Sequence, residues 1–496
     1  MVALLGGLAA CGSIEPTPIA AQELTRTNAV DRDAARKDVE PLREALTLDE
    51  AIARALKYNL DRRARLMEEA LALNQLDVSK LDMLPKLMAQ AGYSDRNQER
   101  ATYSSQYTPV ATARDTTRSS FSAERRHGTA DMGLTWNLLD VGLGYYGSRQ
   151  QADRVLIATE KRRKAMHQLM QDVRTAYWRA AAAQKLRAQV DRTIAMAENA
   201  LEDSRKVEAE RVRSPLDALR YQRQVLENLR LLEAIDQELS TASVELGSLI
   251  NAPIGQAITI AETDVALTGD SVLKVPVSRL EDSALENNAD LREQHYNGRV
   301  AREEVRKTMA RLFPSLSFNY GLKYDSDKYL VHNQWNEAGL QLSFNLFNLI
   351  TADSQIKLAE AGVLLADQRR VATQMAVLAQ VHLARLQLLN ARSQFTRADT
   401  IYNTDQRIAE QVHNRATALA QSKLDLVANE TSAILSLLRR YQALAQVHIA
   451  ENRLMANLGL EPRIGSTSEL SLAELTAQVR GNDNPWAVLQ QNPSRN

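Results

Sequence analysis

The chain contains two copies of one long unit, and this internal duplication limits its possible folds more than any other feature. The segments from Asn59 to Pro85 and from Asn288 to Pro314 match without a gap at an offset of 229 (288 − 59). Farther along, an offset of 208 places Trp136-Asn137-Leu138 on Phe344-Asn345-Leu346. The first copy therefore carries 21 extra residues (229 − 208) between the matched blocks. Such duplication is typical of architectures whose unit does not bury its apolar surface alone.

Composition and charge exclude several classes of protein. The 496 residues include 61 Lys and Arg and 61 Asp and Glu, so the chain lacks the basic excess of a nucleic-acid-binding protein. Gly and Pro are scarce and aromatic residues make up 5% of the chain, which is typical of long helices. No run approaches the roughly 20 apolar residues that a transmembrane helix needs. We expect a mainly helical protein without a nucleic-acid partner.

The single cysteine indicates the cellular compartment. Cys11 ends the tetrapeptide Leu8-Ala9-Ala10-Cys11, which resembles a bacterial lipobox that is cut before a cysteine carrying lipid, such as palmitate. A free thiol behind a truncated ordinary signal peptide is the alternative, because the usual positively charged segment is missing. We expect residues 1–10 to be a signal-peptide remnant. Residues 11–45 then form a lipid-anchored, polar N-terminal connector.

Four segments alternate strictly between apolar and polar residues, which predicts strands. They cover about 86–95, 129–139, 315–324 and 337–346. Strands of about ten residues, tilted near 45°, span roughly 23 Å, the height of the apolar band of an outer-membrane barrel. The side chains that we expect to face lipid are Met132, Leu134, Trp136, Leu316, Phe318, Leu340, Leu342 and Phe344.

A soluble sheet is the alternative interpretation of this alternation, because half-buried strands show the same pattern. Four matches at duplicated positions favour the membrane, since no fifth strand segment is evident that would complete a soluble sheet. Four strands do not close a barrel, and each backbone group left unpaired in lipid costs several kcal/mol. We therefore expect oligomerisation. Three chains would give twelve strands around a polar lumen.

Long helical segments flank the strands. The segments at about 144–211 and 351–418 each predict one helix of roughly 100 Å. Shorter helices, each roughly 50 Å long, are expected at about 48–84, 216–250, 277–312 and 424–458. A short pair stacked end to end matches one long helix, so we expect a helical cylinder that continues from the barrel. Apolar residues from Leu424 onward follow three-four spacing, which favours a coiled coil or an ordinary bundle core. The first copy has Arg223 and Arg230 at two of the equivalent positions. We therefore expect its helix to make polar contacts there or to pack in a shifted register.

The order and spacing of these motifs resemble the TolC-like outer-membrane efflux and secretion channels. The matching elements are Leu46 to Ala51, Asn59-x-Asp61, Asn288-x-Asp290, Leu84-Pro85, Phe313-Pro314, Trp136 to Asp140, Phe344 to Phe347 and two Ser-x-Leu-Asp turns. The resemblance implies a mainly α fold with a transmembrane β part: a homotrimer with a twelve-stranded outer-membrane barrel and a periplasmic α-barrel. It divides the chain into a first repeat (46–252), an equatorial inter-repeat segment (253–276), a second repeat (277–462) and a polar C-terminal tail (463–496).

The resemblance also implies a moving part at the periplasmic tip, where helical hairpins converge and partner proteins open the channel. Its expected residues are Ser214, Asp217, Ser422 and Asp425. Ser and Asp at a helix start commonly cap free N–H groups. A carboxylate repeated by threefold symmetry would instead form an anionic ring that binds cations. Some relatives have a second acid where this sequence has Ala428.

Catalytic interpretations find no support in the sequence. The seven histidines are scattered and form no metal-binding motif, and no Gly-rich phosphate loop is present. We expect no enzyme activity, metal or cofactor. The leading function is a passive exit duct of a tripartite efflux or type I secretion system, opened by a periplasmic adaptor and an inner-membrane pump. The alternative is a periplasmic coiled-coil adaptor or scaffold lipoprotein without a pore.

The cargo and the extra residues of the first copy stay undecided at this point. A wide polar duct selects weakly, so drugs, metals, siderophores and proteins all remain possible cargoes. The 21 extra residues fall within about 96–128, where we expect a longer extracellular loop.

Overall fold

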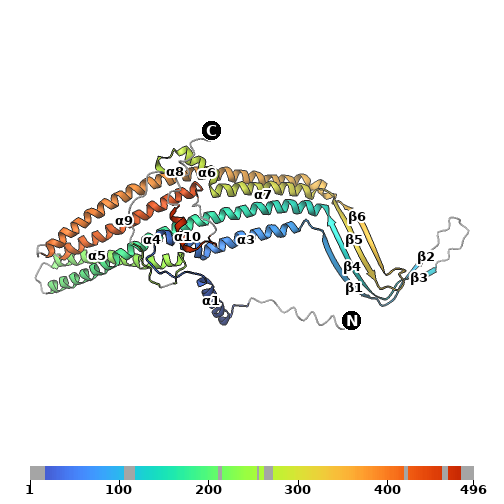
Figure 1. Ribbon diagram of the computed structural model, residues 1–496, viewed down its shortest axis with the longest axis horizontal. Helices are drawn as coiled ribbons and strands as arrows, with labels where there is room; N and C mark the ends of the chain where they lie inside the picture. Colours follow the sequence, from blue (N-terminus) through green and yellow to red (C-terminus); the bar gives the residue numbers. More distant parts are fainter. Residues whose placement is uncertain are drawn as a thin grey trace. The chain divides into compact units, whose positions relative to one another are not determined.

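The computed structural model describes residues 17–104, 118–209, 215–253, 256–261, 272–417, 423–460, 467 and 469–481 (Figure 1). The chain divides into two compact units. The helical unit comprises Met1–Ala64, Ala165–Leu280 and Val381–Asn496, and the sheet unit comprises Arg65–Lys164 and Glu281–Gln380. Among the described residues, no helix is both long and apolar enough to cross a membrane.

The sheet unit is built on four antiparallel strands in the order β1-β4-β5-β6 (Figure 1). The strands are β1 (Lys86–Asp95), β4 (Arg126–Asn137), β5 (Ser315–Asp325) and β6 (Gln334–Ser343). The two copies of the duplicated unit meet at the centre, where Thr135 of β4 lies opposite Asn319 of β5. Strands β1 and β6 are the two edges of this sheet.

Two strand boundaries differ from the sequence prediction. β4 covers 126–137 instead of 129–139, and β6 covers 334–343 instead of 337–346. An asparagine ends the extended segment in each copy: Asn137 Oδ1 accepts a hydrogen bond from the Leu139 amide (2.9 Å), and Asn345 Oδ1 accepts one from the Phe347 amide (3.1 Å). These bonds start a helix, and Phe344 therefore lies beyond β6.

The long helices begin directly after these asparagines. They are α4 (Leu138–Ala209) and α8 (Phe347–Thr417), which start earlier than the predicted 144 and 351. Their shorter neighbours α5 (Pro215–Leu249) and α9 (Lys423–Asn457) follow the prediction closely. Beyond these two helices, Asn251 and Gly459 occupy equivalent positions with φ of 54° and 66°. This left-handed conformation terminates helices, so the duplication extends to the C-terminal caps.

The predicted helices at 48–84 and 277–312 are each broken in two. The pieces are α2 (Leu48–Tyr58) with α3 (Leu60–Leu81), and α6 (Val277–Asn287) with α7 (Ala289–Arg311). Asn59 Oδ1 accepts from the Arg62 amide (3.0 Å), and Asn288 Oδ1 accepts from the Leu291 amide (3.1 Å). The duplicated Asn-x-Asp motif is therefore an N-terminal cap, with an aspartate in the first turn where its charge favours the helix dipole.

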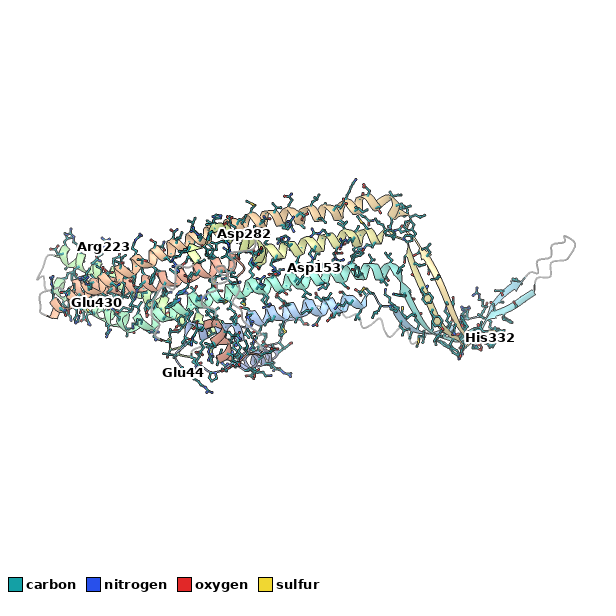
Figure 2. The ribbon with its side chains drawn as sticks, turned by 45° about the horizontal axis from the view of Figure 1, so that its top comes forward. Glu44, Asp153, Arg223, Asp282, His332 and Glu430 are labelled. Carbon is teal, nitrogen blue, oxygen red and sulfur yellow. The ribbon has the colours of Figure 1, made fainter. Side chains whose placement is uncertain are left out.

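Ion pairs join the antiparallel helices α4 and α7 in the sheet unit. Arg292 contacts Glu160 (2.8 Å), and Arg299 contacts Asp153 (2.7 Å), seven residues later on α7 and seven residues earlier on α4. Figure 2 labels Asp153 on this stretch of α4. Burial raises the pKa of Asp153, and the charge of Arg299 opposes that rise. The contact between the two repeats is thus polar where a soluble helical bundle would be apolar.

The expected long loop of the first copy contains a second hairpin, which the sequence interpretation missed. Strands β2 (Arg100–Ser104) and β3 (Arg118–Ala123) pair with each other in a separate two-stranded sheet. Phe121 stacks on Tyr329 at 6.0 Å, and Lys328 lies 3.4 Å from Glu99 and 3.3 Å from Glu124. The connection between β5 and β6, which carries His332 in Figure 2, therefore supports the base of the hairpin.

Two further helices lie in segments expected to be irregular. Helix α1 (Ala21–Arg36) lies in the connector and has no buried residue. Helix α10 (Leu472–Gly481) lies in the polar tail and buries Leu472, Leu475 and Val479. Its start is a capping box, because the Ser471 amide donates to Glu474 (2.9 Å) and the Glu474 amide donates to Ser471 Oγ (3.2 Å).

The inter-repeat segment joins the core of the helical unit. Ile260 forms an isolated parallel bridge with Leu46. Gln184 of α4 holds the backbone of Ile260 through two hydrogen bonds of 2.9 and 2.6 Å. The 3₁₀ turn η2 (Val272–Lys274) then leads into α6. Lys57 of α2 donates to the Leu470 carbonyl (3.0 Å), so the start of the first repeat and the C-terminal tail meet in the same unit.

Candidate functional site

The four-stranded sheet exposes its apolar face. Along β5, every second residue from Leu316 to Tyr324 is exposed, while the intervening Ser, Asn, Gly and Lys residues are half-buried. On edge strand β6, Leu340 and Leu342 are 74% and 70% exposed. This pattern is the reverse of a soluble sheet, which packs its apolar face on a core.

Most of the side chains predicted to face lipid lie on this exposed face. Met132, Trp136, Leu316, Phe318, Leu340 and Leu342 are exposed, whereas Leu134 is half-buried. The register places Trp136 opposite Phe318 and Phe318 opposite Leu340, so these residues form one row across three strands. Phe344 is the exception because it lies outside β6.

The opposite face of the sheet is a network of polar pairs. Thr135 Oγ1 donates to Asn319 Oδ1 (3.0 Å), and Asn137 Nδ2 donates to Ser315 Oγ (2.7 Å). Near the other end of the strands, His127 Nδ1 lies 2.8 Å from Asp325. Such a face is suited to contact with water, because its polar groups retain partners when exposed.

The helices attached to the two edge strands expose apolar seams, which the sequence interpretation missed. Helix α3 leads into β1, and α8 leaves β6. Positions 67, 71, 74, 78 and 81 of α3 are all exposed, as are positions 358, 361, 365, 368, 372 and 375 of α8. Both series follow the three-four spacing of a coiled-coil seam. Their apolar members include Met67, Leu71, Leu365 and Met375, and the polar Asn74 and Gln368 interrupt them. This spacing in the sequence could have revealed them.

Only part of the predicted tip falls within the described residues. Ser214 and Ser422 lie outside them, as does Cys11. Asp217 is exposed in the first turn of α5, 3.8 Å from Arg220. Asp425 lies in the first turn of α9. Both acids thus lie where a helix begins.

The helices that lead away from the tip have a buried seam with different registers in the two copies. On α9, Val427, Thr431, Ile434 and Leu438 are buried. On α5, Val225, Leu229 and Leu232 are buried instead, and Arg223 is exposed (labelled in Figure 2). Of the two expected alternatives, polar contacts or a shifted register, the buried residues of the first copy show a shifted register.

The packing around this seam joins the two repeats. Val427 of α9 packs with Ala197 and Leu201 of α4 and with Val225 and Leu229 of α5. Gln189 of α4 donates to Glu430 of α9 at 3.2 Å. Helix α9 therefore contacts both helices of the first-copy hairpin.

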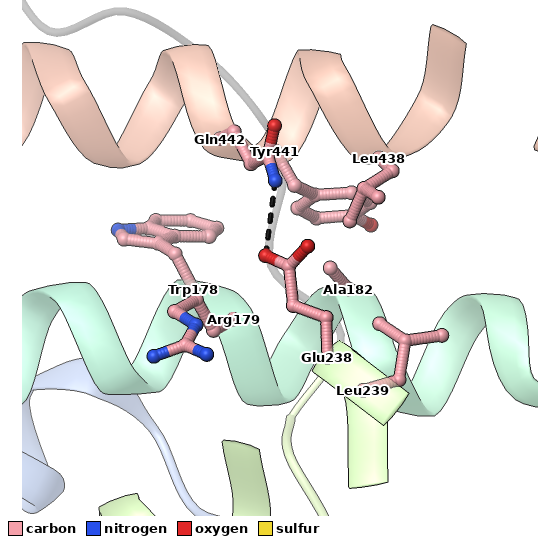
Figure 3. Close-up of a pocket in the computed structure, with 8 residues that line it drawn as sticks. All are labelled: Trp178, Arg179, Ala182, Glu238, Leu239, Leu438, Tyr441 and Gln442. Atoms are coloured by element: carbon pink, nitrogen blue, oxygen red, sulfur yellow. Dashed lines mark hydrogen bonds between the residues drawn. The ribbon is translucent and has the colours of Figure 1, made fainter. Parts of the chain in front are cut away.

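A small pocket lies where α4, α5 and α9 meet (Figure 3). Gln442 of α9 donates to Glu238 of α5 across it (3.0 Å), and Trp178 and Tyr441 line its walls (Figure 3). Its volume is about 10 Å³, close to that of one water molecule. The pocket is therefore a packing defect between helices and has no room for a cargo molecule.

A buried polar cluster lies next to this pocket. Arg392 of α8 donates to Glu451 of α9 (2.8 Å), and Arg174 of α4 donates to Asn452 of α9 (2.8 Å). Burial raises the pKa of Glu451, against the effect of Arg392. Burial, together with Arg174 and Arg392, lowers the pKa of His448 to about 4. These groups join three helices from both copies and supply no arrangement for catalysis.

Comparison with solved structures identifies the fold. The chain superimposes on the Campylobacter jejuni CmeC outer membrane channel with a TM-score of 0.63 and 13% identity, covering 95% of this chain and 94% of that one. The outer membrane protein VceC of Vibrio cholerae gives 0.59 and 15%, covering 83% and 96%. The MtrE outer membrane channel of Neisseria gonorrhoeae gives 0.59 and 16%, covering 82% and 88%. The fold is that of the TolC-like outer-membrane channels.

Sequence comparison adds the family. Residues 280–460 match the family described as outer membrane efflux protein. The second repeat thus resembles the outer membrane efflux protein family, which agrees with the resemblance drawn from the sequence motifs. This family consists of transport channels and not of enzymes. A comparison with curated protein sequences finds no match.

Proposed function

We propose that this chain is the protomer of a passive exit duct in the outer membrane. The observation that carries the proposal is the sheet with an exposed apolar face, a paired polar face and two open edges. In lipid, the apolar face is stable, but the backbone groups of β1 and β6 need partners. Pairing between copies satisfies them, and the polar face then lines a water-filled lumen.

Three copies of the chain are enough to close the proposed barrel. Twelve strands (3 × 4) close a barrel wide enough for a water-filled lumen, because barrel diameter grows with strand number. In this arrangement β1 of one copy pairs with β6 of the next. The exposed seams on α3 and α8 support it, since each seam continues from the strand that would form the same contact. A homotrimer with cyclic symmetry satisfies both edges of every copy.

The partners follow from the family and the tip. The described residues form no catalytic arrangement, so in this proposal an inner-membrane pump supplies the energy and a periplasmic adaptor opens the duct. We place their contact at the hairpin turns 211–217 and 418–425. Asp217 and Asp425 would there form anionic rings around the aperture, with Ser214 and Ser422 in the turns. Both efflux of small molecules and type I secretion are compatible with the polar lining of the proposed lumen.

The N-terminus supplies a second membrane attachment. We propose that Cys11 carries lipid after removal of residues 1–10, which tethers the connector to the periplasmic leaflet of the outer membrane. The lipobox-like tetrapeptide Leu8-Ala9-Ala10-Cys11 supports this proposal. Intact-mass measurement of the mature protein is the direct experiment. A Cys11→Ser variant should lack the lipid mass yet remain in the membrane fraction, because the barrel alone is sufficient for insertion.

Conductance in planar bilayers tests the duct itself. The purified protein should run as a trimer in detergent by light scattering and should open stable aqueous pores when reconstituted with its adaptor. The alternative, a periplasmic adaptor or scaffold lipoprotein without a pore, predicts a protein that is soluble once the lipid is removed. A soluble Cys11→Ser variant without conductance would contradict the proposed duct.

A further inference from the structure

An apolar groove lies at the junction of helices and strands in the sheet unit. It is formed by the first turns of α4 and the last turns of α7 and has a volume of about 450 Å³. Its apolar lining consists of Leu138, Leu139, Met309, Ala310, Phe313 and Pro314, with Tyr146 and Arg306 among the remaining lining residues. Leu138, Met309 and Phe313 are exposed large apolar residues, which mark an interaction surface.

The groove continues the apolar face of the sheet. Trp136 and Leu316 lie on that face, and Leu138 and Pro314 of the groove lie two residues from them along the chain, just outside the strands. Figure 1 shows that α4 leaves β4 and α7 leads into β5 at the same end of the sheet. A molecule in contact with the apolar face can therefore extend into the groove.

A second copy of the chain is a poor occupant for this groove. β4 and β5 are the two central strands, whereas the edges open to another copy are β1 and β6. In the proposed trimer, the junction of β4 and β5 with their helices is thus distant from both neighbouring copies. The occupant must come from the medium that surrounds the sheet.

The positively charged side chains beside the groove favour an anionic ligand. Arg306 lies 2.7 Å from Glu303, and the same carboxylate lies 3.0 Å from Arg149. Two guanidinium groups therefore share one buried carboxylate, which leaves one positive charge in excess. Lys307 and Arg311 add further positive charge to the end of α7, although Arg311 lies 3.6 Å from Glu304. A basic group next to an apolar groove is suited to a lipid phosphate.

We infer that this groove binds an anionic phospholipid of the periplasmic leaflet, with an acyl chain against Leu138, Met309 and Phe313 and the phosphate at Arg306. The inference rests on the proposed membrane-spanning barrel, because only that placement brings the strand ends to the level of the headgroups. The lipid would fill the groove at the junction between the apolar strands and the polar helices.

Native mass spectrometry of the detergent-solubilised trimer, titrated with phosphatidylglycerol, tests the site. Gly142 lines the groove, and an added Cβ there meets no atom within 4 Å. Gly142→Leu should therefore fill the groove without moving its walls and should abolish retention of the lipid. Arg306→Gln should weaken binding roughly fivefold, the contribution of one basic side chain near a membrane surface. Glu303 keeps Arg149 as a partner in this variant.

The matched control is Gly481→Leu at the end of α10, where an added Cβ also meets open space. It should bind lipid as the unmodified chain does. Unchanged phosphatidylglycerol binding in Gly142→Leu would overturn the inference, as would equal binding of zwitterionic phosphatidylethanolamine by the unmodified chain. Conductance of the same preparations separates the two proposals. Conducting trimers with unchanged lipid binding in Gly142→Leu refute the lipid site alone, whereas unmodified trimers without conductance refute the duct.

Discussion

The imidazole of His448 lies parallel to the indole of Trp178, with 5.4 Å between ring centroids and 3° between ring planes. This stack joins α9 to α4 inside the helical unit, next to the pair of Arg392 and Glu451. Burial of the ring, together with Arg174 from α4 and Arg392 from α8, disfavours its protonation, although Glu451 Oε2 lies 3.7 Å from His448 Nδ1. The stack therefore consists of a neutral imidazole on an aromatic surface.

Acid should destabilise the helical unit through His448. Its pKa falls from 6.5 to about 4 on folding, so stability is complete above pH 6.5 and is lost as the pH falls toward 4. The loss is about 3 kcal/mol. His448→Phe keeps the stack but does not titrate, so its thermal stability should vary less between pH 6.5 and 4. His332→Phe, an exposed histidine, is the control and should retain the full pH dependence. An equal pH dependence in both variants would contradict the assignment.

A charge on the apolar face of the sheet should prevent membrane assembly. Leu340→Arg places a cation on that face and should cost about 2 to 4 kcal/mol near the bilayer midplane. Gln341→Arg, one residue farther along β6, places the same charge on the polar face and should assemble normally. Heat-resistant trimers on semi-native gels report the result. Equal assembly of the two variants is incompatible with a lipid-facing Leu340.

The seam of α3 should matter for trimer formation and not for folding of the protomer. Leu71→Glu removes an exposed leucine from the seam and should weaken each subunit contact by about 2 kcal/mol, the contribution of one buried leucine. Leu73→Glu alters a leucine that is also exposed but lies off the three-four spacing. Light scattering against protein concentration should show dissociation of the first variant only. Helical content by circular dichroism should stay unchanged in both.

The asparagines that break the helices should stabilise the first turn of the helix that follows in each copy. Asn288→Ala removes an N-terminal cap and should cost about 1 kcal/mol. Asn59→Ala removes its cap together with the hydrogen bond that Asn59 donates to the Leu249 carbonyl (3.0 Å), so its cost should include both contacts. Hydrogen exchange at the first turns of α3 and α7 measures the loss locally. Similar exchange rates in both variants and the unmodified chain would exclude a capping role.

Charge and capping can be separated at the tip. Asp217 lies in the first turn of α5, where Asp217→Asn removes the charge and keeps a side-chain oxygen that can accept from backbone amides. If the carboxylates form an anionic ring, the reversal potential in a KCl gradient should shift toward that of a non-selective pore. Asp217→Ala should show the same shift together with lower stability of α5. Unchanged selectivity in both variants would assign Asp217 to structure alone.

Much of the sheet was predictable because period-two alternation over ten residues has few other causes. The end of β6 was not, since alternation continues through Phe344 and Leu346 although Asn345 already turns the chain into α8. The same reasoning applies to Asn137, whose cap starts α4 six residues before the predicted start at 144 (144 − 138). Local hydrogen bonding by a single side chain overrides a longer pattern at these points.

The missed elements lack a strong apolar pattern. Helix α1 buries no residue, and β2 and β3 pair only with each other. Helix α10 could have been found from Ser471 and Glu474, because a capping box is visible in sequence. The polar cluster around His448 depends on residues from α4, α8 and α9, and no local pattern predicts which of them meet.

The β2–β3 hairpin occurs in only one copy of the duplicated unit. A trimer of duplicated chains would repeat its wall six times around the axis but would present three such hairpins at its outer end. A ligand with three matching epitopes would gain avidity there, whereas a single epitope would not. In the proposed trimer, the extra residues of the first copy would set the number of binding sites that the protein presents at the cell surface.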